Sequence, residues 1–313
     1  MSKKICFLSF AFLIVTKSFS QDPIFSNTEQ SLVYLNPSFA GTNGGIRNQF
    51  IYRNQWPNLS GNYITFYNGT EVYLKRLKGA LALTYLHDDQ ARGTLKTNVL
   101  SLIYAQHFSF KDDKLKISPS VKASYFDKTL DNSKLYFGED IDPKRGFVFA
   151  SQSEPVPSQI KRNFDVSSGL LINYNHFYFG ASVFHINQPD EGLLGTSKLP
   201  ARFSVHSSYN VHVSEKTLFH FFGRYEMQQN FYFYQLVTTA LLFKHLIIGA
   251  GIVNGTTPTA NLGFKHNYFT VQANYGLTTS LLTTTRAETW EITTSFNLRN
   301  KEQRKVLTDF EKW

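Results

Sequence analysis

The sequence predicts an all-β protein, a transmembrane antiparallel β-barrel of the bacterial outer membrane with about 14 strands and a short N-terminal plug-like segment. First, segments of about ten residues with apolar side chains at every second position recur along the chain, and no window keeps a helical period for three turns. Second, aromatic residues make up 16% of the chain, yet its mean hydropathy of -0.25 is too low for a bundle of spanning helices. Third, the links between the segments sort by length, as in bacterial barrels.

Residues 1–20 form a predicted secretory signal peptide that is cleaved before Gln21. This leader combines Lys3 and Lys4 with an apolar run from Ile5 to Val15 and a small residue at Ser20. The apolar run is shorter than the roughly 20 residues that a spanning helix needs. We therefore expect an exported protein and not one anchored by this segment.

Loss of the leader also removes the only cysteine, Cys6. The mature chain would then have no thiol, which excludes disulfides, thiolate metal sites and cysteine nucleophiles. Lys3, Lys4 and Lys17 leave with the leader, so the formal charge falls from +9 by three to +6. The remaining positive charge is scattered among turns and tails without a basic stripe, and we expect no nucleic acid partner.

Residues 21–45 are expected to form a periplasmic or plug segment ahead of the first strand. Asn36-Pro37 does not fit a regular ladder, and the glycines between Gly41 and Gly45 favour turns. An alternating strand begins at Ile46. These residues either shape a segment that occupies the barrel mouth or simply start and end turns, and both readings remain open. A barrel of this size has an interior wide enough to need filling.

The predicted barrel covers residues 46–299. Its fourteen expected strands are residues 46–55, 63–75, 80–87, 95–110, 115–127, 164–174, 177–187, 201–213, 218–226, 231–243, 246–253, 259–266, 268–277 and 288–299. In the clearest alternation, Trp290, Ile292, Phe296 and Leu298 oppose Glu291, Thr293, Ser295 and Asn297. One face of each strand is expected to contact outer-membrane lipid and the other to contact water.

The longest expected loop is 128–163, a polar stretch rich in Pro, Asp, Lys and Ser. If the first strand leaves the periplasm, this loop, the polar loop 88–94 and the loop 188–199 all lie outside, and only short turns lie inside. The even number of strands returns the tail, residues 300–313, to the periplasm. A soluble β-sandwich would also alternate, but it would neither sort its loops by length nor need a separate polar face inside.

Two clusters of polar side chains are candidate sites of chemistry. His87-Asp88-Asp89 could bind a divalent cation, but a solvated loop is the favoured interpretation. His206, His212 and His220 lie near Ser204, Ser207 and Ser208 in the sequence, but no acid is spaced to orient a histidine. We therefore predict no catalytic, cofactor or metal site and no enzymatic activity.

Several stretches together resemble a known family. They are LNPSFAG at 35–41, YRNQWP at 52–57, KTNVLSLIYAQHF at 96–108, SYFDKTLDNSKLYFGEDID at 124–142 and NFDVSSGLLINYNHFYFGASVFHINQP at 163–189. In this order, after a leader and with a barrel pattern, they resemble the PorP/SprF family of the type IX secretion system. The chain departs from the family near the last strand, where it reads Arg286-Ala287-Glu288-Thr289-Trp290.

The resemblance implies an outer-membrane barrel of Bacteroidetes without a cofactor, and it marks structural or plug residues. These are Leu35, Asn36, Pro37, Ala40, Gly41, Tyr52, Arg53, Asn54, Gln55, Trp56 and Pro57. Some family members look like core machinery linked to periplasmic ring or peptidoglycan-associated lipoproteins. Others look like dedicated partners of one large secreted protein, often a gliding or surface adhesin.

Our hypothesis is the dedicated partner, which assists export of one adhesin-like protein or holds it at the cell surface. The long polar loop is the expected contact region. Its charged candidates are Lys128, Asp131, Lys134, Glu139, Asp140, Asp142, Lys144 and Arg145. A core subunit of the machinery and a porin-like solute channel remain the alternatives.

Overall fold

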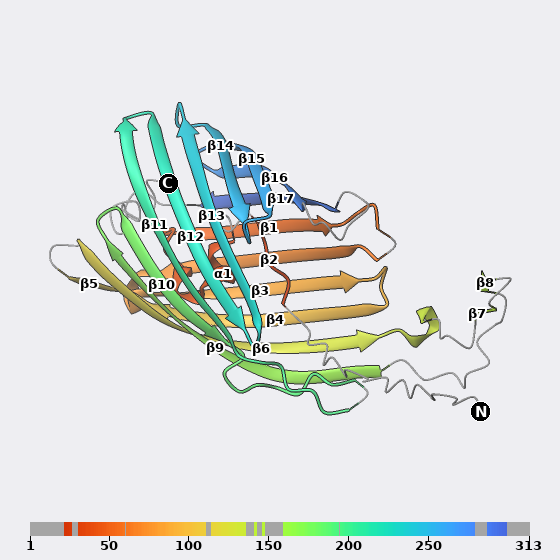
Figure 1. Ribbon diagram of the computed structural model, residues 1–313. Coiled ribbons are helices and arrows are strands. Elements are labelled where there is room, and N and C mark those ends of the chain that lie inside the picture. Colours follow the sequence, from red (N-terminus) through yellow and green to blue (C-terminus); the bar gives the residue numbers. More distant parts are fainter. Residues whose placement is uncertain are drawn as a thin grey trace, which may run out of the picture.

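The computed structural model describes residues 22–26, 31–59, 61–110, 114–135, 141–142, 146–147, 159–193, 195–278 and 287–298. Within these residues the chain folds as a closed β-barrel with a short N-terminal segment inside it (Figure 1). None of the described helices is long and apolar enough to cross a membrane.

One antiparallel sheet forms the barrel wall. Its strands are β1 (Ile46–Gln55), β2 (Tyr63–Leu74), β3 (Gly79–Gln90), β4 (Leu95–Gln106), β5 (Phe108–Phe110), β6 (Leu115–Leu130), β9 (Gln159–Tyr174), β10 (Phe177–Phe184), β11 (Arg202–Ser214), β12 (Thr217–Gln228), β13 (Phe231–Leu242), β14 (Leu246–Val253), β15 (Thr257–Lys265), β16 (Phe269–Thr278) and β17 (Ala287–Leu298). Strands β4 and β5 are two parts of one wall strand, interrupted at His107, and both pair with β6. The predicted barrel of 14 antiparallel strands is confirmed.

The first and last strands close the barrel. β1 pairs with β17 over its whole length, from Ile46 opposite Leu298 to Gln55 opposite Thr289. Each wall strand therefore has a hydrogen-bonded neighbour on both sides. Closure removes the free sheet edges, whose unpaired N–H and C=O groups would be costly in a bilayer. A separate small hairpin, β7 (Ile141–Asp142) with β8 (Gly146–Phe147), lies within the longest connection.

The two faces of the wall are inverted relative to a soluble protein. On β17, Glu291, Thr293 and Ser295 are buried inside, whereas Trp290 and Ile292 are exposed on the outer surface. The same pattern holds on β16, where Gln272 and Asn274 are buried and Val271 is exposed. The alternation expected from the sequence is thus confirmed, with the apolar face directed to lipid and the polar face to the lumen.

Two loops were predicted too long because they include strand residues. β3 continues to Gln90, so His87, Asp88 and Asp89 belong to a strand and not to a polar loop. β6 continues to Leu130 and β9 begins at Gln159, so the longest connection is 131–158 and not 128–163. Both errors have one cause. Polar residues on the lumen side of a barrel strand resemble a loop when only composition is considered.

The connections differ between the two ends of the barrel. One end carries the long connections 131–158 and 185–201 together with 279–286, and a short 3₁₀ helix, η3 (Asn132–Lys134), begins the first of them. The other end carries short turns, such as 175–176, 215–216 and the turn around η2 (Lys75–Leu77). Long loops are extracellular in bacterial barrels, so the end with 131–158 is the outer end.

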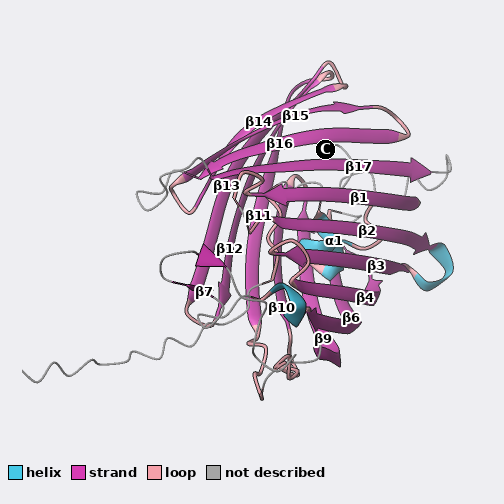
Figure 2. Cartoon of the chain, turned by 90° about the vertical axis from the view of Figure 1, so that its right-hand side faces the viewer, coloured by secondary structure: helices cyan, strands magenta, loops and turns pink. Residues whose placement is uncertain are grey.

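Two short helices lie inside the barrel, ahead of β1 (Figure 2). They are α1 (Leu32–Leu35) and η1 (Pro37–Phe39), and turns around Gly41 and Gly44 connect them to β1. The Asn36 side chain caps η1 by accepting a hydrogen bond from Ser38 N, and Pro37 sits at the first helical position, where its missing N–H costs nothing. We call residues 31–45 the plug.

A charge on the lipid face should destabilise the folded barrel strongly in the middle of the wall and only slightly at its end. Leu236 lies at the centre of β13 and is 62% exposed. We expect Leu236→Arg to lower the free energy of unfolding by about 2–4 kcal/mol, because a charge at the bilayer midplane loses its hydration. The measurement is the denaturant midpoint of folding into phospholipid vesicles.

The matched control is Val213→Arg, which places the same charge near the short-turn end of β11. There the expected cost is about 0–1 kcal/mol. Equal costs at both positions would contradict the placement of the wall in the bilayer.

Candidate functional site

The plug is held in the lumen by hydrogen bonds from several strands. The Asn36 side chain is fully buried and donates to Leu170 O on β9 at 3.1 Å and to Ala181 O on β10 at 3.2 Å. The Ser182 hydroxyl donates to Leu35 O at 3.1 Å. Asn36 therefore satisfies two wall carbonyls and one plug amide at once, which fixes the register of the plug against the wall.

The plug is also fixed where it leads into β1. Gly41 N donates to Glu71 Oε2 of β2 at 2.9 Å, and the His107 ring donates from Nε2 to Ala40 O at 2.9 Å. Glu71 in turn forms an ion pair with Arg47 of β1, with 2.5 Å between Oε1 and Nε. His107 is the residue that separates β4 from β5, so the break in this strand coincides with a contact to the plug.

Glycines in the wall make room for the plug. A Cβ atom added at Gly169 on β9 would overlap Asn36 Oδ1, and one added at Gly180 on β10 would overlap the His206 ring. Gly41 has a φ of +75°, a conformation that residues with a Cβ rarely adopt, and it lies against Ala80. The sequence of the wall is therefore adapted to the segment that fills it.

A second N-terminal segment, residues 22–26, which we call the strap, lies at the outer end of the lumen. Phe25 is fully buried and packs edge to face on Tyr34 and Tyr67, with ring centroids 4.9 Å and 6.1 Å away. Arg224 on β12 donates to Phe25 O at 2.7 Å, and Gln235 on β13 donates to Ser26 O at 2.6 Å. The strap is thus anchored by an aromatic side chain and by main-chain hydrogen bonds to the wall.

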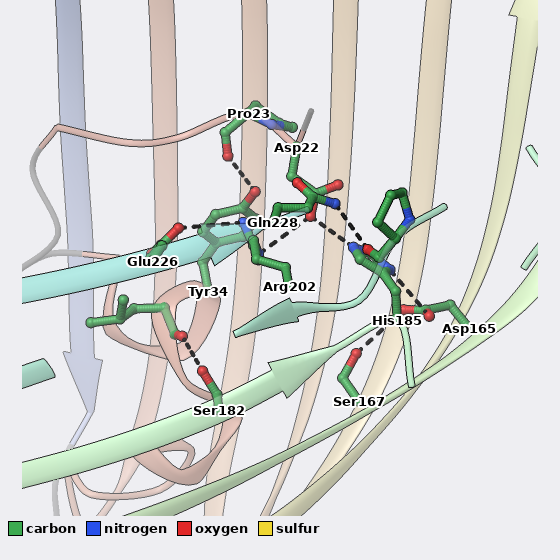
Figure 3. A network of polar contacts seen from close by, with 12 residues as sticks. Asp22, Pro23, Tyr34, Asp165, Ser167, Ser182, His185, Arg202, Glu226 and Gln228 are labelled. Atoms are coloured by element: carbon green, nitrogen blue, oxygen red, sulfur yellow. Dashed lines mark hydrogen bonds and ion pairs between the residues drawn. The ribbon is translucent and has the colours of Figure 1, made fainter. Parts of the chain in front are cut away.

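An ionic network holds the strap at Asp22 (Figure 3). Asp22 Oδ2 lies 2.7 Å from His185 Nε2 and 3.4 Å from Arg202 Nε. His185 Nδ1 faces Asp165 Oδ1 at 3.2 Å, and Arg202 Nη1 lies 3.9 Å from Glu226 Oε2. These residues come from the β10–β11 connection, β9, β11 and β12, so the strap carboxylate joins a network that spans four parts of the barrel.

The network changes the pKa values of its members at the barrel mouth. Burial by itself lowers the pKa of His185, but the carboxylates of Asp22 and Asp165 outweigh it and raise this pKa to about 9. Burial alone would raise the pKa of the Asp22 carboxyl group, but His185 and Arg202 bring it below its usual value. Both partners are therefore charged at neutral pH.

Above the strap, the outer end of the lumen holds a cavity of about 720 Å³, which we call the outer vestibule. The strap residues Asp22, Pro23, Ile24 and Ser26 form one side of it. Its other lining residues are Arg53, Gln55, Trp56, Tyr63, Asp88, Gln90, Leu95, Lys128, Phe231, Phe233, Val253, Asn254, Thr257, Gly276 and Thr289. The lumen thus combines a filled half around the plug with a hollow half at the outer end.

The family motif residues fall into three groups. Leu35, Asn36, Pro37 and Ala40 are buried plug residues, and Gly41 makes the plug turn. Arg53 faces the lumen and pairs with Glu291 at 3.2 Å, and Gln55 and Trp56 line the outer vestibule. Tyr52 and Asn54 lie at the alternate, outward positions of β1, where Tyr52 is 42% exposed. Pro57 follows β1 in the link to β2.

The predicted contact loop is only partly described. Lys128 does not belong to it, because this residue lies in β6, is 6% exposed and pairs inside the barrel with Glu191 at 2.9 Å. Asp131 caps η3 through Ser133 N, and Lys134 donates to Arg92 O, so both lie at the start of the loop. Asp142 belongs to β7. Glu139, Asp140, Lys144 and Arg145 lie outside the described residues.

The histidines and carboxylates of the two candidate clusters make packing contacts and hydrogen bonds with the barrel. His206 packs against the rings of Phe39 and Phe222, and His220 Nδ1 lies 2.6 Å from Asn210 Oδ1. Asp88 points into the lumen and accepts from Thr65, whereas its neighbour His87 bonds with Asn98. In the described part of the chain, no group of three or more His, Cys, Asp or Glu side chains could hold a metal ion.

Sequence analysis missed the ionic network around Asp22. Arg224 and Glu226 occupy alternate positions of β12 and face the lumen, where they lie 3.1 Å apart. Charged residues of opposite sign at inward positions of neighbouring strands are the pattern that could have revealed it. Asp22 could not be found from this pattern, because it lies outside any strand.

The sequence of this plugged barrel matches a known protein family over most of its length. The family model described as type IX secretion system membrane protein PorP/SprF matches residues 17–296. The chain belongs to the PorP/SprF family. It is therefore a membrane protein of the type IX secretion system and resides in the outer membrane, as the resemblance predicted. The matching family is not described as an enzyme.

One solved structure supports the fold. The monoaromatic hydrocarbon channel CymD aligns with a TM-score of 0.52 and 12% identity, over 87% of this chain and 93% of that one. Omp33 of Acinetobacter baumannii aligns at 0.45 with 8% identity, over 80% and 98% of the two chains. A FadL homologue of Pseudomonas aeruginosa aligns at 0.43 with 8% identity, over 81% and 89%. No curated protein matches the chain.

Filling the space at Gly169 should displace the plug. We expect Gly169→Ala to push Asn36 away from its two wall carbonyls. Overpacking and the lost hydrogen bonds should lower the free energy of unfolding by about 1–3 kcal/mol. The measurements are the denaturant midpoint and the single-channel conductance in planar bilayers, which should rise as the lumen opens.

Gly276→Ala is the matched control, because a Cβ there would meet Thr259 Cγ2 at an ordinary 3.5 Å. This variant should keep the parent midpoint and conductance. The role of Gly169 would be disproved if both variants behaved alike.

The strap should loosen as the pH rises. The pKa of His185 increases from its ordinary 6.5 to about 9 on folding, so the stability from its charge is complete below pH 6.5 and is lost as the pH passes about 9. The pKa of Asp22 decreases from 3.8, so its contribution is present above pH 3.8 and is lost only as the pH falls to the lowered value. We expect the denaturant midpoint to decline between pH 6.5 and 9.

His185→Gln serves as the comparison for this pH series. Its midpoint should be lower at pH 6 and should lack the decline, because glutamine does not titrate. An identical decline in the two proteins would assign the pH dependence to other groups.

Proposed function

We propose that this protein is a non-enzymatic outer-membrane component of the type IX secretion system that holds one secreted adhesin-like partner at the cell surface or assists its export. The observation that carries the proposal is the asymmetric lumen. The plug fills its inner part through contacts such as Asn36 to β9 and β10, and the outer vestibule of about 720 Å³ opens at the long-loop end. This arrangement favours a surface receptor over an open pore.

The filled inner half weighs against the porin-like channel. Leu35, Asn36, Ser38, Phe39 and Ala40 are buried inside the barrel, and hydrogen bonds tie them to β6, β9 and β10. A solute that passed through the barrel would have to break these contacts. The partner would accordingly be bound from outside and not threaded through this lumen.

The surroundings of the histidines support the non-enzymatic part of the proposal. The two ring nitrogens of a catalytic histidine must reach a nucleophile and an orienting acid. His220 is instead bonded to an amide, Asn210, and His206 packs against the rings of Phe39 and Phe222. A packing role accounts for both residues.

The outer loop is the proposed contact for the partner. Asp131 and Lys134 mark its start beside the rim, and it is the longest connection at the outer end. Its length and polarity suit a protein contact. Since Lys128 and the residues from Gln159 belong to the wall, the contact region is narrowed to residues 131–158.

The proposal predicts a specific loss from the cell surface. In a strain that lacks this gene, we expect one large adhesin-like protein to disappear from the surface and secreted proteome, measured by mass spectrometry against the parent. Loss of all cargo would instead identify a core subunit linked to periplasmic lipoproteins. An unchanged proteome would contradict both secretion roles, and conductance of the purified protein would then test the channel.

Replacement of the loop tests where the partner binds. A short Gly-Ser turn in place of residues 132–158 should release the partner into the medium while the barrel remains in the outer membrane. The control replaces residues 192–196, in the other long outer connection, and should keep the partner on the cell. Retention of the partner by the first variant would refute the loop assignment.

A further inference from the structure

The N-terminal segment crosses the lumen in the direction opposite to β1. Its early residues lie at the outer end, where Asp22 contacts His185 in the β10–β11 connection and Arg202 at the start of β11. Its late residues lie at the other end, where Gly41 packs against Ala80, just after the short turn between β2 and β3. From there β1 returns along the wall, so that Trp56 reaches the outer vestibule again.

Independent contacts fix both ends of this path. The strap is tied to β12, β13 and β17 by Arg224 to Phe25 O, Gln235 to Ser26 O and Ser26 N to Glu291 Oε1. The plug is tied to β2 and to the break between β4 and β5 by Gly41 and Ala40. In between, the Tyr34 hydroxyl donates to Pro23 O at 2.5 Å and joins α1 to the strap.

We infer that the mature amino terminus lies at the cell surface and not in the periplasm. The strap lines the outer vestibule, and the end of the barrel that carries this vestibule also carries the long connections 131–158 and 185–201. Since long connections are extracellular in bacterial barrels, the residues next to the predicted cleavage site face outwards. The chain then enters the barrel from outside, passes down through the lumen and begins its first strand at the periplasmic end.

This topology makes the amino terminus part of an interaction surface. Any molecule that enters the outer vestibule meets the main chain and side chains of Asp22, Pro23 and Ile24. Asp22 is held there by direct contacts with His185 and Arg202, and the charge of Lys122 also attracts it. Asp165 and Glu226 in turn pair with His185 and Arg202. A ligand that competed for His185 or Arg202 would break the contacts of Asp22 and leave the strap held by Phe25 and Ser26.

An epitope at the amino terminus tests the topology directly. A short epitope on a flexible Gly-Ser linker is inserted between Gln21 and Asp22, so that antibody can reach it above the rim. We expect antibody to stain intact cells. The same epitope inserted at Glu215, in the short turn between β11 and β12, should be stained only after the outer membrane is permeabilised.

Cysteine labelling tests the same point if the insertion disturbs cleavage or folding. The only cysteine of the chain, Cys6, lies in the leader, so a single introduced cysteine is the only thiol of the mature protein. Ile24→Cys should react on intact cells with a poly(ethylene glycol) maleimide that is too large for porins. Glu215→Cys should react only in permeabilised cells, and Ser133→Cys at the outer rim provides the positive control.

Staining of the amino terminus, or labelling of Ile24→Cys, only after permeabilisation would overturn the inference. Neither result depends on whether a secreted partner exists. The topology can therefore fail while the proposed function survives, and the reverse also holds.

Discussion

The pairing of backbone N–H and C=O groups within a bilayer is the constraint on which the rest of this structure depends. Lipid offers these groups no partners, so a sheet can span the membrane only when its last strand returns to its first. The register of β1 against β17, from Ile46 with Leu298 to Gln55 with Thr289, meets this requirement. Closure then fixes one face of each strand against lipid and the other around a lumen, and it inverts the usual distribution of apolar and polar residues.

The lumen creates a second requirement, because a wall of polar side chains needs partners inside. The plug supplies them with short polar residues. Asn36 bonds to β9 and β10, Ser38 to Ser120, and Gly41 to Glu71. Gly169 makes the fit possible by leaving space for Asn36. Plug and wall are thus complementary in hydrogen bonding as well as in volume, which explains a filled inner half beside a hollow outer half.

The charges around the strap meet a third requirement, the pairing of buried ions. Buried ions are costly unless they are paired, and the network of Asp22, His185, Asp165, Arg202 and Glu226 pairs groups from four parts of the barrel with the strap. This cluster stabilises one position of a segment that has no regular secondary structure of its own. It also sets the chemistry of the outer vestibule, where Arg53 and Lys128 are paired with Glu291 and Glu191. The remaining carboxylate of this lining, Asp88, accepts hydrogen bonds from Thr65 and Gln90. The vestibule therefore presents aromatic and amide groups to a ligand more than free charge.

The sequence by itself determined the barrel and its fourteen strands, because a two-residue period and the sorting of loop lengths are local properties of the chain. Its family was indicated separately, by motifs such as LNPSFAG at 35–41 and YRNQWP at 52–57. Local patterns failed where composition misleads. Asp88 and Lys128 looked like loop residues, but they are lumen-facing strand residues whose partners, Thr65 and Glu191, are distant in sequence. Only the tertiary structure decided the path of residues 22–45, the pairing of Asp22 with His185 and Arg202, and the division of the lumen into plug and vestibule. The physical reason is that these features depend on which strands face one another across a closed barrel, and periodicity along one strand carries no information about that.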